Sequence, residues 1–82
     1  MKAIRWSARA VEDLESLDPG IARRIRAGLL RYAETGSGDV IRLQNEGGKL
    51  RLRVGDWRIL FEEAPAGNIH VQRVLHRSQA YR

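Results

Sequence analysis

The chain has 82 residues, with 15 Lys and Arg against 10 Asp and Glu, so its net charge is +5. That length suits one domain, residues 1–82, and 43% hydrophobic with 30% charged residues is typical of a globular chain rather than a disordered one. The absence of cysteine excludes disulfide scaffolds and cysteine-ligated metal sites, and two histidines are too few for a metal cage, so we expect no metal and no cofactor.

A strand and a helix are predicted at the start of the chain. Residues 2–6 are predicted as a short strand. Ser7 can cap a helix over residues 8–17, because a serine hydroxyl accepts a hydrogen bond from the free amides of a first helical turn. Apolar residues recur at three- and four-residue spacing in this helix and give it one apolar face, formed by Ala10, Val11, Leu14 and Leu17.

A second helix is predicted directly after the first. Asp18 is its expected N-cap and Pro19 its first residue, where the missing N–H of proline costs nothing. The helix runs to about Ala33 and ends at the turn residues 35–38. Its predicted apolar stripe consists of Ile21, Ile25, Gly28, Leu29 and Tyr32. Two consecutive helices with so short a break predict a helical hairpin.

Beyond the second helix the apolar period changes from 3.6 to 2, which predicts strands. Turn residues separate four strand candidates, at residues 40–43, 49–54, 57–63 and 69–75, with the turns at 45–48, 55–56 and 65–68. The order of elements is βααββββ. We therefore predict an α+β fold, in which a short N-terminal strand and an α-helical hairpin pack on a mainly antiparallel β-sheet.

The two-residue turn Gly55-Asp56 fixes how the strands on either side of it pair. Three apolar pairs share one face of this hairpin: Val54 with Trp57, Leu52 with Ile59, and Leu50 with Phe61. We expect this face to pack against the helices, so that Trp57 belongs to the core. On the opposite face the same counting places Lys49 across from Glu62, Arg51 across from Leu60, and Arg53 across from Arg58.

Arginine supplies 13 of the 15 basic residues, and the net charge is +1 over residues 1–41 but +4 over residues 42–82. A GC-rich genome is one explanation of the arginine bias, and a solvated face with acidic counter-ions is one explanation of the cluster. However, like charges directly across a ladder destabilise it by up to about 1 kcal/mol. Arginine also presents a planar fork of donors that fits phosphate. Three arginines on one face, Arg51, Arg53 and Arg58, therefore favour an anion-binding site.

The last strand and the tail add further polar groups. Neither face of the last strand is cleanly apolar, so its orientation stays open, and a bulge near Arg73 is one explanation. The tail contains His76, Arg77 and Tyr81 within seven residues. It is either a frayed basic terminus or part of a nucleic-acid surface on which Tyr81 stacks or contacts phosphate.

Several other chemistries lack the residues that they need. The sequence has no P-loop, no HExxH metal motif and no Ser-His-Asp set that it places together. Glu62 and Glu63 are adjacent in a strand and point to opposite faces, so they do not form a glycosidase pair. An arginine-lined surface can instead bind an RNA phosphate and stabilise the negative charge of its cleavage, in which the 2′-OH supplies the nucleophile.

Three segments carry a resemblance to a known family. They are Ile4–Ser7 with the helix that follows, the central segment 50–61, and the closing segment 74–82. With these segments the whole chain resembles the RelE/ParE superfamily of bacterial type II toxins. The family fold is a helical hairpin on a curved antiparallel sheet. Its RelE-like members are ribosome-dependent mRNA endonucleases and its ParE-like members inhibit DNA gyrase.

The nuclease branch has five site positions, and the resemblance implies that all are filled here. Arg51 and Arg53 match two basic residues on the strand before the hairpin, and Arg58 matches an arginine just after the turn. Arg77 matches an arginine after the last strand, and Tyr81 matches a C-terminal tyrosine. Some relatives have lysine in the pair of basic residues on the strand before the hairpin, where this chain has two arginines. Arginine cannot act as a general base. The spacing from Arg77 to Tyr81 is also shorter than in some relatives.

The resemblance implies a metal-independent attack of the mRNA 2′-OH on the adjacent phosphate, which leaves a 2′,3′-cyclic phosphate and a 5′-OH. The three arginines of the hairpin would bind the phosphate and stabilise the transition state. Arg77 would stabilise charge at the scissile phosphate or the leaving oxygen. Either Tyr81 or His76 would handle the proton, and histidine side chains ordinarily titrate near neutral pH.

The resemblance also implies partners: a cognate antitoxin protein, the ribosome and mRNA. One alternative is a ParE-type inhibitor of DNA gyrase without nuclease activity, and another is a purely binding member whose arginine face serves an acidic antitoxin. No apolar run approaches the roughly 18–20 residues of a membrane span, and no signal peptide opens the chain. We therefore expect a cytoplasmic protein without a membrane partner.

Overall fold

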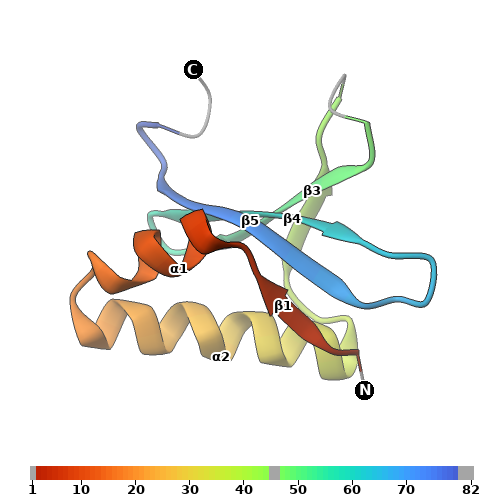
Figure 1. The fold of residues 1–82 in the computed structure, drawn as a ribbon, viewed down its shortest axis with the longest axis horizontal. Coiled ribbons are helices and arrows are strands. Elements are labelled where there is room, and N and C mark those ends of the chain that lie inside the picture. The colour runs from red at the N-terminus through yellow and green to blue at the C-terminus, as the bar shows by residue number, and fades with distance from the viewer. Residues whose placement is uncertain (1, 45–46, 80–82) are drawn as a thin grey trace.

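Two helices lie on one side of a five-stranded sheet in the computed structural model (Figure 1), which describes residues 2–44 and 47–79. The elements in chain order are β1 (Ile4–Trp6), α1 (Ala8–Glu15), α2 (Pro19–Thr35), β2 (Asp39–Arg42), β3 (Lys49–Val54), β4 (Trp57–Glu63) and β5 (Ile69–His76). The strand order is β1-β5-β4-β3-β2. Only the β1–β5 pair in this sheet is parallel, so the α+β class and the mainly antiparallel sheet are confirmed.

The two helices begin at the predicted caps. Ser7 Oγ accepts a hydrogen bond from Ala10 N at 3.0 Å, and Asp18 Oδ2 accepts one from Gly20 N at 3.0 Å. At the end of α2, Gly36 has a φ of +75°, and its N–H donates to Tyr32 O at 2.8 Å. Glycine adopts this left-handed conformation without steric cost, which is why the helix ends there.

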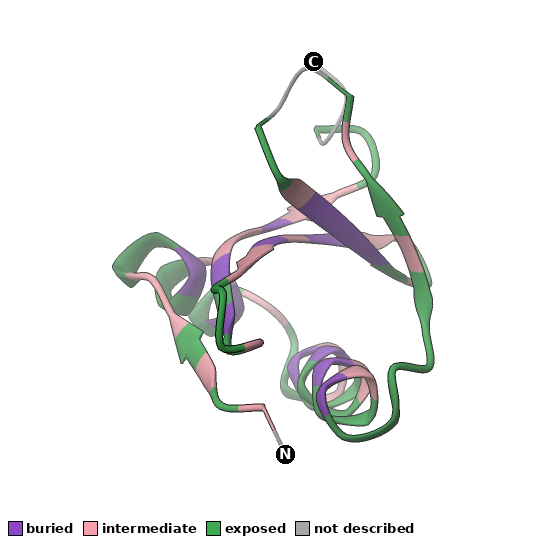
Figure 2. Cartoon of the chain, turned by 90° about the vertical axis from the view of Figure 1, so that its right-hand side faces the viewer, coloured by how far each residue is buried: buried purple, intermediate pink, exposed green. Residues whose placement is uncertain are grey.

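The core lies between the helices and the sheet. Helix α1 packs mainly on β5 and α2 on β3, and Figure 2 shows buried stretches in the strands and in α2. The buried apolar residues are Ala10, Leu14, Ala22, Ile25, Leu29, Ala33, Leu50, Leu52, Ile59, Phe61, Ile69, Val71 and Val74. The predicted apolar faces of the helices are partly wrong, because Val11 is 41% exposed while Ala22 and Ala33 are buried.

The central hairpin has the predicted register. Val54 lies opposite Trp57, Arg53 opposite Arg58, and the other pairs follow from Leu52–Ile59 to Lys49–Glu62. Gly55 has a φ of +58°, a conformation that a two-residue hairpin turn requires and that glycine adopts freely. One face of the hairpin is therefore apolar and faces the helices, and the other carries its arginines.

Strand β5 contains the bulge that its sequence left open. Val71 lies opposite Phe61, whereas Arg73 lies opposite Leu60, so Gln72 is an extra residue on β5. Because of this extra residue, Val71 and Val74 both point into the core, although an uninterrupted strand would put them on opposite faces. The predicted alternation along this strand therefore holds only on each side of the bulge.

A polar cluster joins the N-terminal segment, α2 and the end of β4. Tyr32 Oη donates to Glu63 Oε1, and Lys2 Nζ lies 3.4 Å from Glu63 Oε2. Burial and this hydrogen bond raise the pKa of Tyr32 to about 12. The hydrogen bond from Tyr32, followed by the Lys2 ammonium, lowers the pKa of the Glu63 carboxyl below its ordinary value.

These two shifts predict stability changes at both ends of the pH scale. The folded chain holds the Tyr32 proton more tightly than the unfolded chain, so this contribution is full below about pH 10 and is lost as pH rises toward about 12. The contribution of Glu63 is full above its ordinary pKa and is lost as pH falls through its lowered pKa. The measurement is the free energy of unfolding in urea as a function of pH. We expect Tyr32→Phe to flatten the alkaline limb of this curve and Glu63→Gln to flatten its acidic limb. Unchanged limbs would contradict this assignment.

Candidate functional site

Three arginines lie on the sheet face that points away from the helices, and we call this set the arginine face: Arg51, Arg53 and Arg58. Arg51 and Arg53 are on β3. Arg58 is the second residue of β4 and lies directly opposite Arg53. Their neighbours along the strands, such as Leu52 and Ile59, are buried against the helices. The structure therefore brings together the three hairpin residues that the sequence predicts as a site.

Arg51 is buried on this face and has an acidic neighbour. The residue is 8% exposed, and its Nη2 atom lies 3.3 Å from Asp39 Oδ1 on β2. In the ladder Asp39 lies directly opposite Arg53, but its carboxylate turns to Arg51. Part of the charge of Arg51 is therefore neutralised within the protein. Asp39 is a site residue that the sequence did not indicate, because it falls one residue before the predicted strand 40–43.

Arg58 is buried in a different setting. The residue is 6% exposed, and its Nη1 atom donates to the backbone oxygens of Gly55 at 2.9 Å and Trp57 at 3.1 Å. Its Nε atom is buried and has no hydrogen-bond partner, and within residues 2–44 and 47–79 no carboxylate makes an ion pair with it. A buried charge without an ion-pair partner is expensive, so an anion close to this guanidinium would lower that cost.

Arg77 joins the same end of the sheet. It follows β5 directly, its N–H donates to Asp56 O at 2.8 Å, and its Nε atom lies 3.9 Å from Asp56 Oδ1. Both side chains are about two-thirds exposed, with 65% for Arg77 and 67% for Asp56. The turn Gly55-Asp56 thus holds Arg58 through one carbonyl and Arg77 through the next. Together with the exposed Arg53, these residues form a cationic cluster around the turn.

Of the two candidates for proton transfer, His76 lies within the described residues, and it is not placed with this cluster. His76 lies opposite Trp57 in the ladder, and the two rings are 5.2 Å apart in an edge-to-face arrangement. Its Nδ1 atom is 3.0 Å from Ser78 Oγ. His76 therefore shares the face of Trp57 rather than the arginine face. Tyr81 lies outside the described residues.

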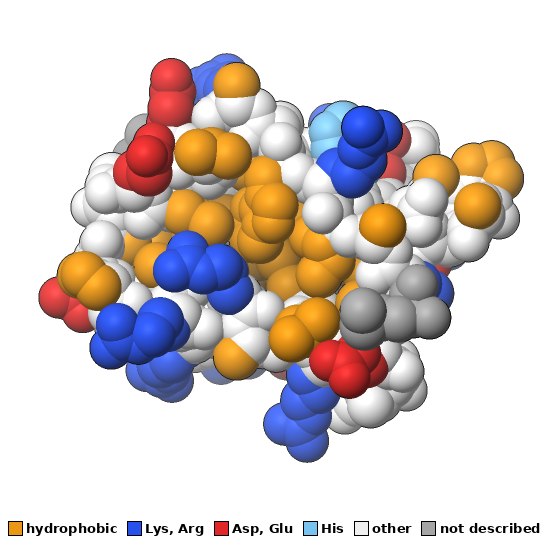
Figure 3. Space-filling view, turned by 60° about the horizontal axis from the view of Figure 1, so that its bottom comes forward, with side chains coloured by type: hydrophobic (Ala, Val, Ile, Leu, Met, Phe, Trp, Pro, Cys, Tyr) orange, Lys and Arg blue, Asp and Glu red, His pale blue; other side chains and the backbone are white. Residues whose placement is uncertain are grey.

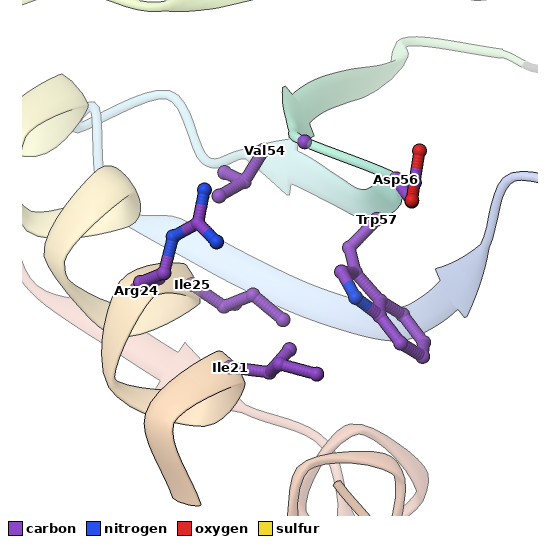
Figure 4. A pocket seen from close by; sticks show the side chains of 7 residues that line it. Ile21, Arg24, Ile25, Val54, Asp56 and Trp57 are labelled. Atoms are coloured by element: carbon purple, nitrogen blue, oxygen red, sulfur yellow. The ribbon is translucent and has the colours of Figure 1, made fainter. Parts of the chain in front are cut away.

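On the helix side, a cavity of about 280 Å³ opens between α2 and the hairpin turn. Figure 4 shows Trp57 on one side of it, across from Ile21 and Ile25, with Arg24 and Asp56 at the edge. Figure 3, a view that brings the underside of Figure 1 forward, shows a broad hydrophobic area bordered by basic side chains. Trp57 is half-buried and packs against the core, as predicted, so it is not available to stack a base on the arginine face.

Within the described residues, no three His, Asp or Glu side chains come together in a way that could hold a metal ion. Over the same residues, neither helix is long and apolar enough to cross a membrane. The charged groups of the cluster can bind and orient an anion.

Comparison with known proteins identifies the family. Residues 4–81 match the model of the ParE toxin of type II toxin–antitoxin systems. The chain belongs to this toxin family. It is thus a member of the RelE/ParE superfamily, as its three sequence segments suggest. A search of the curated proteins found no match.

Solved structures show the same fold. This toxin is 26% identical to a chain of the RelB–RelE antitoxin–toxin complex from Methanococcus jannaschii, with a TM-score of 0.77 and 94% of each chain covered. It is also 26% identical to a chain of the toxin–antitoxin complex RelBE2 from Mycobacterium tuberculosis, with a TM-score of 0.73, 93% of this chain and 98% of that chain covered. YafQ from E. coli, at 10% identity and a TM-score of 0.75 with both chains covered completely, shares the fold alone.

Proposed function

We propose that this toxin is a metal-independent, ribosome-dependent mRNA endonuclease that inhibits translation in the cytoplasm. The observation that carries the proposal is Arg58, a buried guanidinium held by backbone carbonyls, with a free Nε atom and no carboxylate beside it among the described residues. Arg53 lies directly across the ladder, and Arg77 is held at the same turn. Such a cationic cluster suits a phosphodiester whose negative charge grows during reaction.

In the proposed reaction, the 2′-OH of the mRNA attacks the adjacent phosphate in line and expels the 5′-oxygen of the next nucleotide. The 2′-OH gives up its proton to a base, the bond to the leaving oxygen breaks as the cyclic phosphate forms, and the leaving oxygen takes up a proton. Arg53 and Arg58 hold the non-bridging oxygens, and Arg77 stabilises the scissile phosphate or the leaving oxygen. Arg51, which shares its charge with Asp39, supports the phosphate from further along the strand. Because His76 faces Trp57, Tyr81 is our first candidate for proton transfer and His76 the second.

The proposed protein partner is a cognate antitoxin. The M. jannaschii and M. tuberculosis relatives were both solved in antitoxin–toxin complexes, and this chain covers almost all of their matched chains. The net charge of +5 favours an acidic partner segment.

A second candidate function is inhibition of DNA gyrase without nuclease activity. The observation that favours it is the match of residues 4–81 to the ParE toxin model. Under this hypothesis the cationic cluster binds gyrase or its DNA rather than mRNA. The two candidates make opposite predictions about which nucleic acid is cut in the cell.

Two assays on one protein distinguish these functions. Cells given a short pulse of expression without antitoxin should show new mRNA 5′ ends by primer extension, and purified protein should leave gyrase supercoiling intact. New DNA breaks and blocked supercoiling with intact mRNA would instead establish the gyrase inhibitor. Normal growth with neither effect would contradict both and leave a binding protein. Arg26→Ala removes one positive charge from an exposed position on α2, and it should behave as wild type in both assays.

A further inference from the structure

The bulge in β5 decides which side chains reach the cationic cluster. With Gln72 as the extra residue, Trp57 lies opposite His76, and Arg77 N–H reaches Asp56 O. Without it, every later residue of β5 would shift by one position against β4. Leu75 would then lie opposite Trp57, and Arg77 would move past Asp56 toward the face of Trp57, because a shift of one residue reverses the face.

Helix α1 and its cap hold this bulge from both sides. Ser7 Oγ donates to Gln72 O at 2.8 Å, and Asp13 Oδ2 accepts the Val74 N–H at 2.8 Å. The same Asp13 carboxylate also binds Arg73 through Nε at 2.9 Å and Nη2 at 3.2 Å. A bulge leaves backbone groups without ladder partners, and these hydrogen bonds satisfy them. We call Ser7 and Asp13 the bulge clamp.

Asp13 is the stronger half of the clamp. Its side chain is only 18% exposed, and it makes three charge-assisted hydrogen bonds to two consecutive residues of β5. The hydrogen bonds from Arg73 to Asp13 also raise the pKa of the Arg73 guanidinium above its ordinary value. The carboxylate comes from a helix about 60 residues away in sequence and therefore couples the position of α1 to the register of the last strand.

We infer that Asp13 is a positioning residue of the toxin: it fixes the bulged register of β5 and thereby sets Arg77 beside the Gly55-Asp56 turn. The register part stands on the geometry alone. The effect on cleavage rests on the proposed function, in which Arg77 acts on the scissile phosphate.

The register is tested by NMR on the full chain. In Asp13→Ala we expect the cross-strand contacts between Ile59 and Val74 to weaken, and contacts between Ile59 and Arg73 to appear. Hydrogen-exchange protection of the Val74 amide, relative to the amides of β3, should fall about tenfold or more. Asp13→Asn keeps an oxygen for this amide and should show a smaller fall, so it serves if the alanine variant does not fold. Glu63→Gln, which breaks a carboxylate ion pair away from the bulge, should leave the ratio unchanged.

The activity test separates this inference from the proposed function. If wild type cleaves ribosome-bound mRNA, Asp13→Ala should lower kcat about 100-fold with little change in KM, as when one oriented transition-state donor is lost. Glu63→Gln should not do so at equal folded fraction. An unchanged Ile59–Val74 register and Val74 protection in both Asp13 variants would overturn the inference, whatever the activity. If wild type has no nuclease activity, the proposed function fails while the NMR result still decides the register.

Discussion

Arg58→Ala is expected to abolish growth arrest and to lower the rate of mRNA cleavage about 100- to 1,000-fold, the loss seen when one preorganised donor is removed from a transition-state site. The reason is the placement of this guanidinium, which is buried, held by the carbonyls of Gly55 and Trp57, and left with its Nε atom unsatisfied. A phosphate that comes close to this guanidinium would offset the cost of burying its charge. Single-turnover cleavage of ribosome-bound mRNA measures the effect directly.

The same residue is expected to cost stability rather than supply it. A charge that is buried without an ion-pair partner carries a large desolvation cost, which an apolar side chain of similar length avoids, and functional sites commonly sacrifice stability for activity. Arg58→Met should therefore unfold in urea at the same or a higher midpoint than wild type and yet be inactive. Arg58→Lys keeps the charge but loses the fork of donors, so its rate of mRNA cleavage should lie between those of wild type and Arg58→Met.

The control for these variants is Arg26→Ala, which removes an exposed arginine from α2. It should change the free energy of unfolding by no more than about 0.5 kcal/mol and leave cleavage intact. A folded Arg58→Met that still arrests growth and cleaves mRNA at the wild-type rate would show that Arg58 does not bind the scissile phosphate.

The parts of the fold that could be predicted from sequence are those fixed by local chemistry. Ser7 and Asp18 mark the helix starts, because short polar side chains satisfy the first free amides. Gly55-Asp56 allows only one pairing of its flanking strands, since a shift by one residue would turn Leu52 and Ile59 to solvent. This register alone placed the three hairpin arginines on one face.

The remaining parts depend on contacts between distant segments. The bulge at Gln72 is held by Asp13, and no local pattern in β5 reveals that carboxylate. The parallel pairing of β1 with β5 involves three residues, too few to specify a direction from composition. Asp39 pairs with Arg51 across a connection whose length leaves the register of β2 open. The site is therefore predicted where a tight turn controls it and missed where α1 or β2 contributes.

This difference explains why the proton-transfer group is harder to assign than the phosphate site. Arg53 and Arg58 belong to one hairpin, so their proximity follows from a single turn. His76 is placed by the far side of a bulge, and the bulge turns it toward Trp57. An uninterrupted alternation along β5 would put His76 on the arginine face, and one extra residue puts it on the opposite face.

Phe61→Ala is expected to act through the fold instead of the site. Phe61 is fully buried on β4, and its ring lies 5.5 Å from that of Tyr32 in an edge-to-face arrangement. Removing a buried phenylalanine side chain costs about 3–5 kcal/mol, against a total stability of about 5–15 kcal/mol for a typical domain. Urea unfolding should show a loss of this size, and growth arrest should weaken because less folded toxin accumulates.

The conservative variant separates this effect from catalysis. Phe61→Leu keeps most of the apolar volume but loses the ring contact with Tyr32, which is worth about 0.5–1.5 kcal/mol beyond burial. It should fold and cleave mRNA normally per folded molecule, whereas Arg58→Met should be folded and inactive. Phe61 lies on the face of the sheet opposite to the arginine face, so it can affect the phosphate only through the packing of the core. A Phe61→Leu protein that is stable but inactive would therefore show that the helix side of the sheet takes part in the reaction.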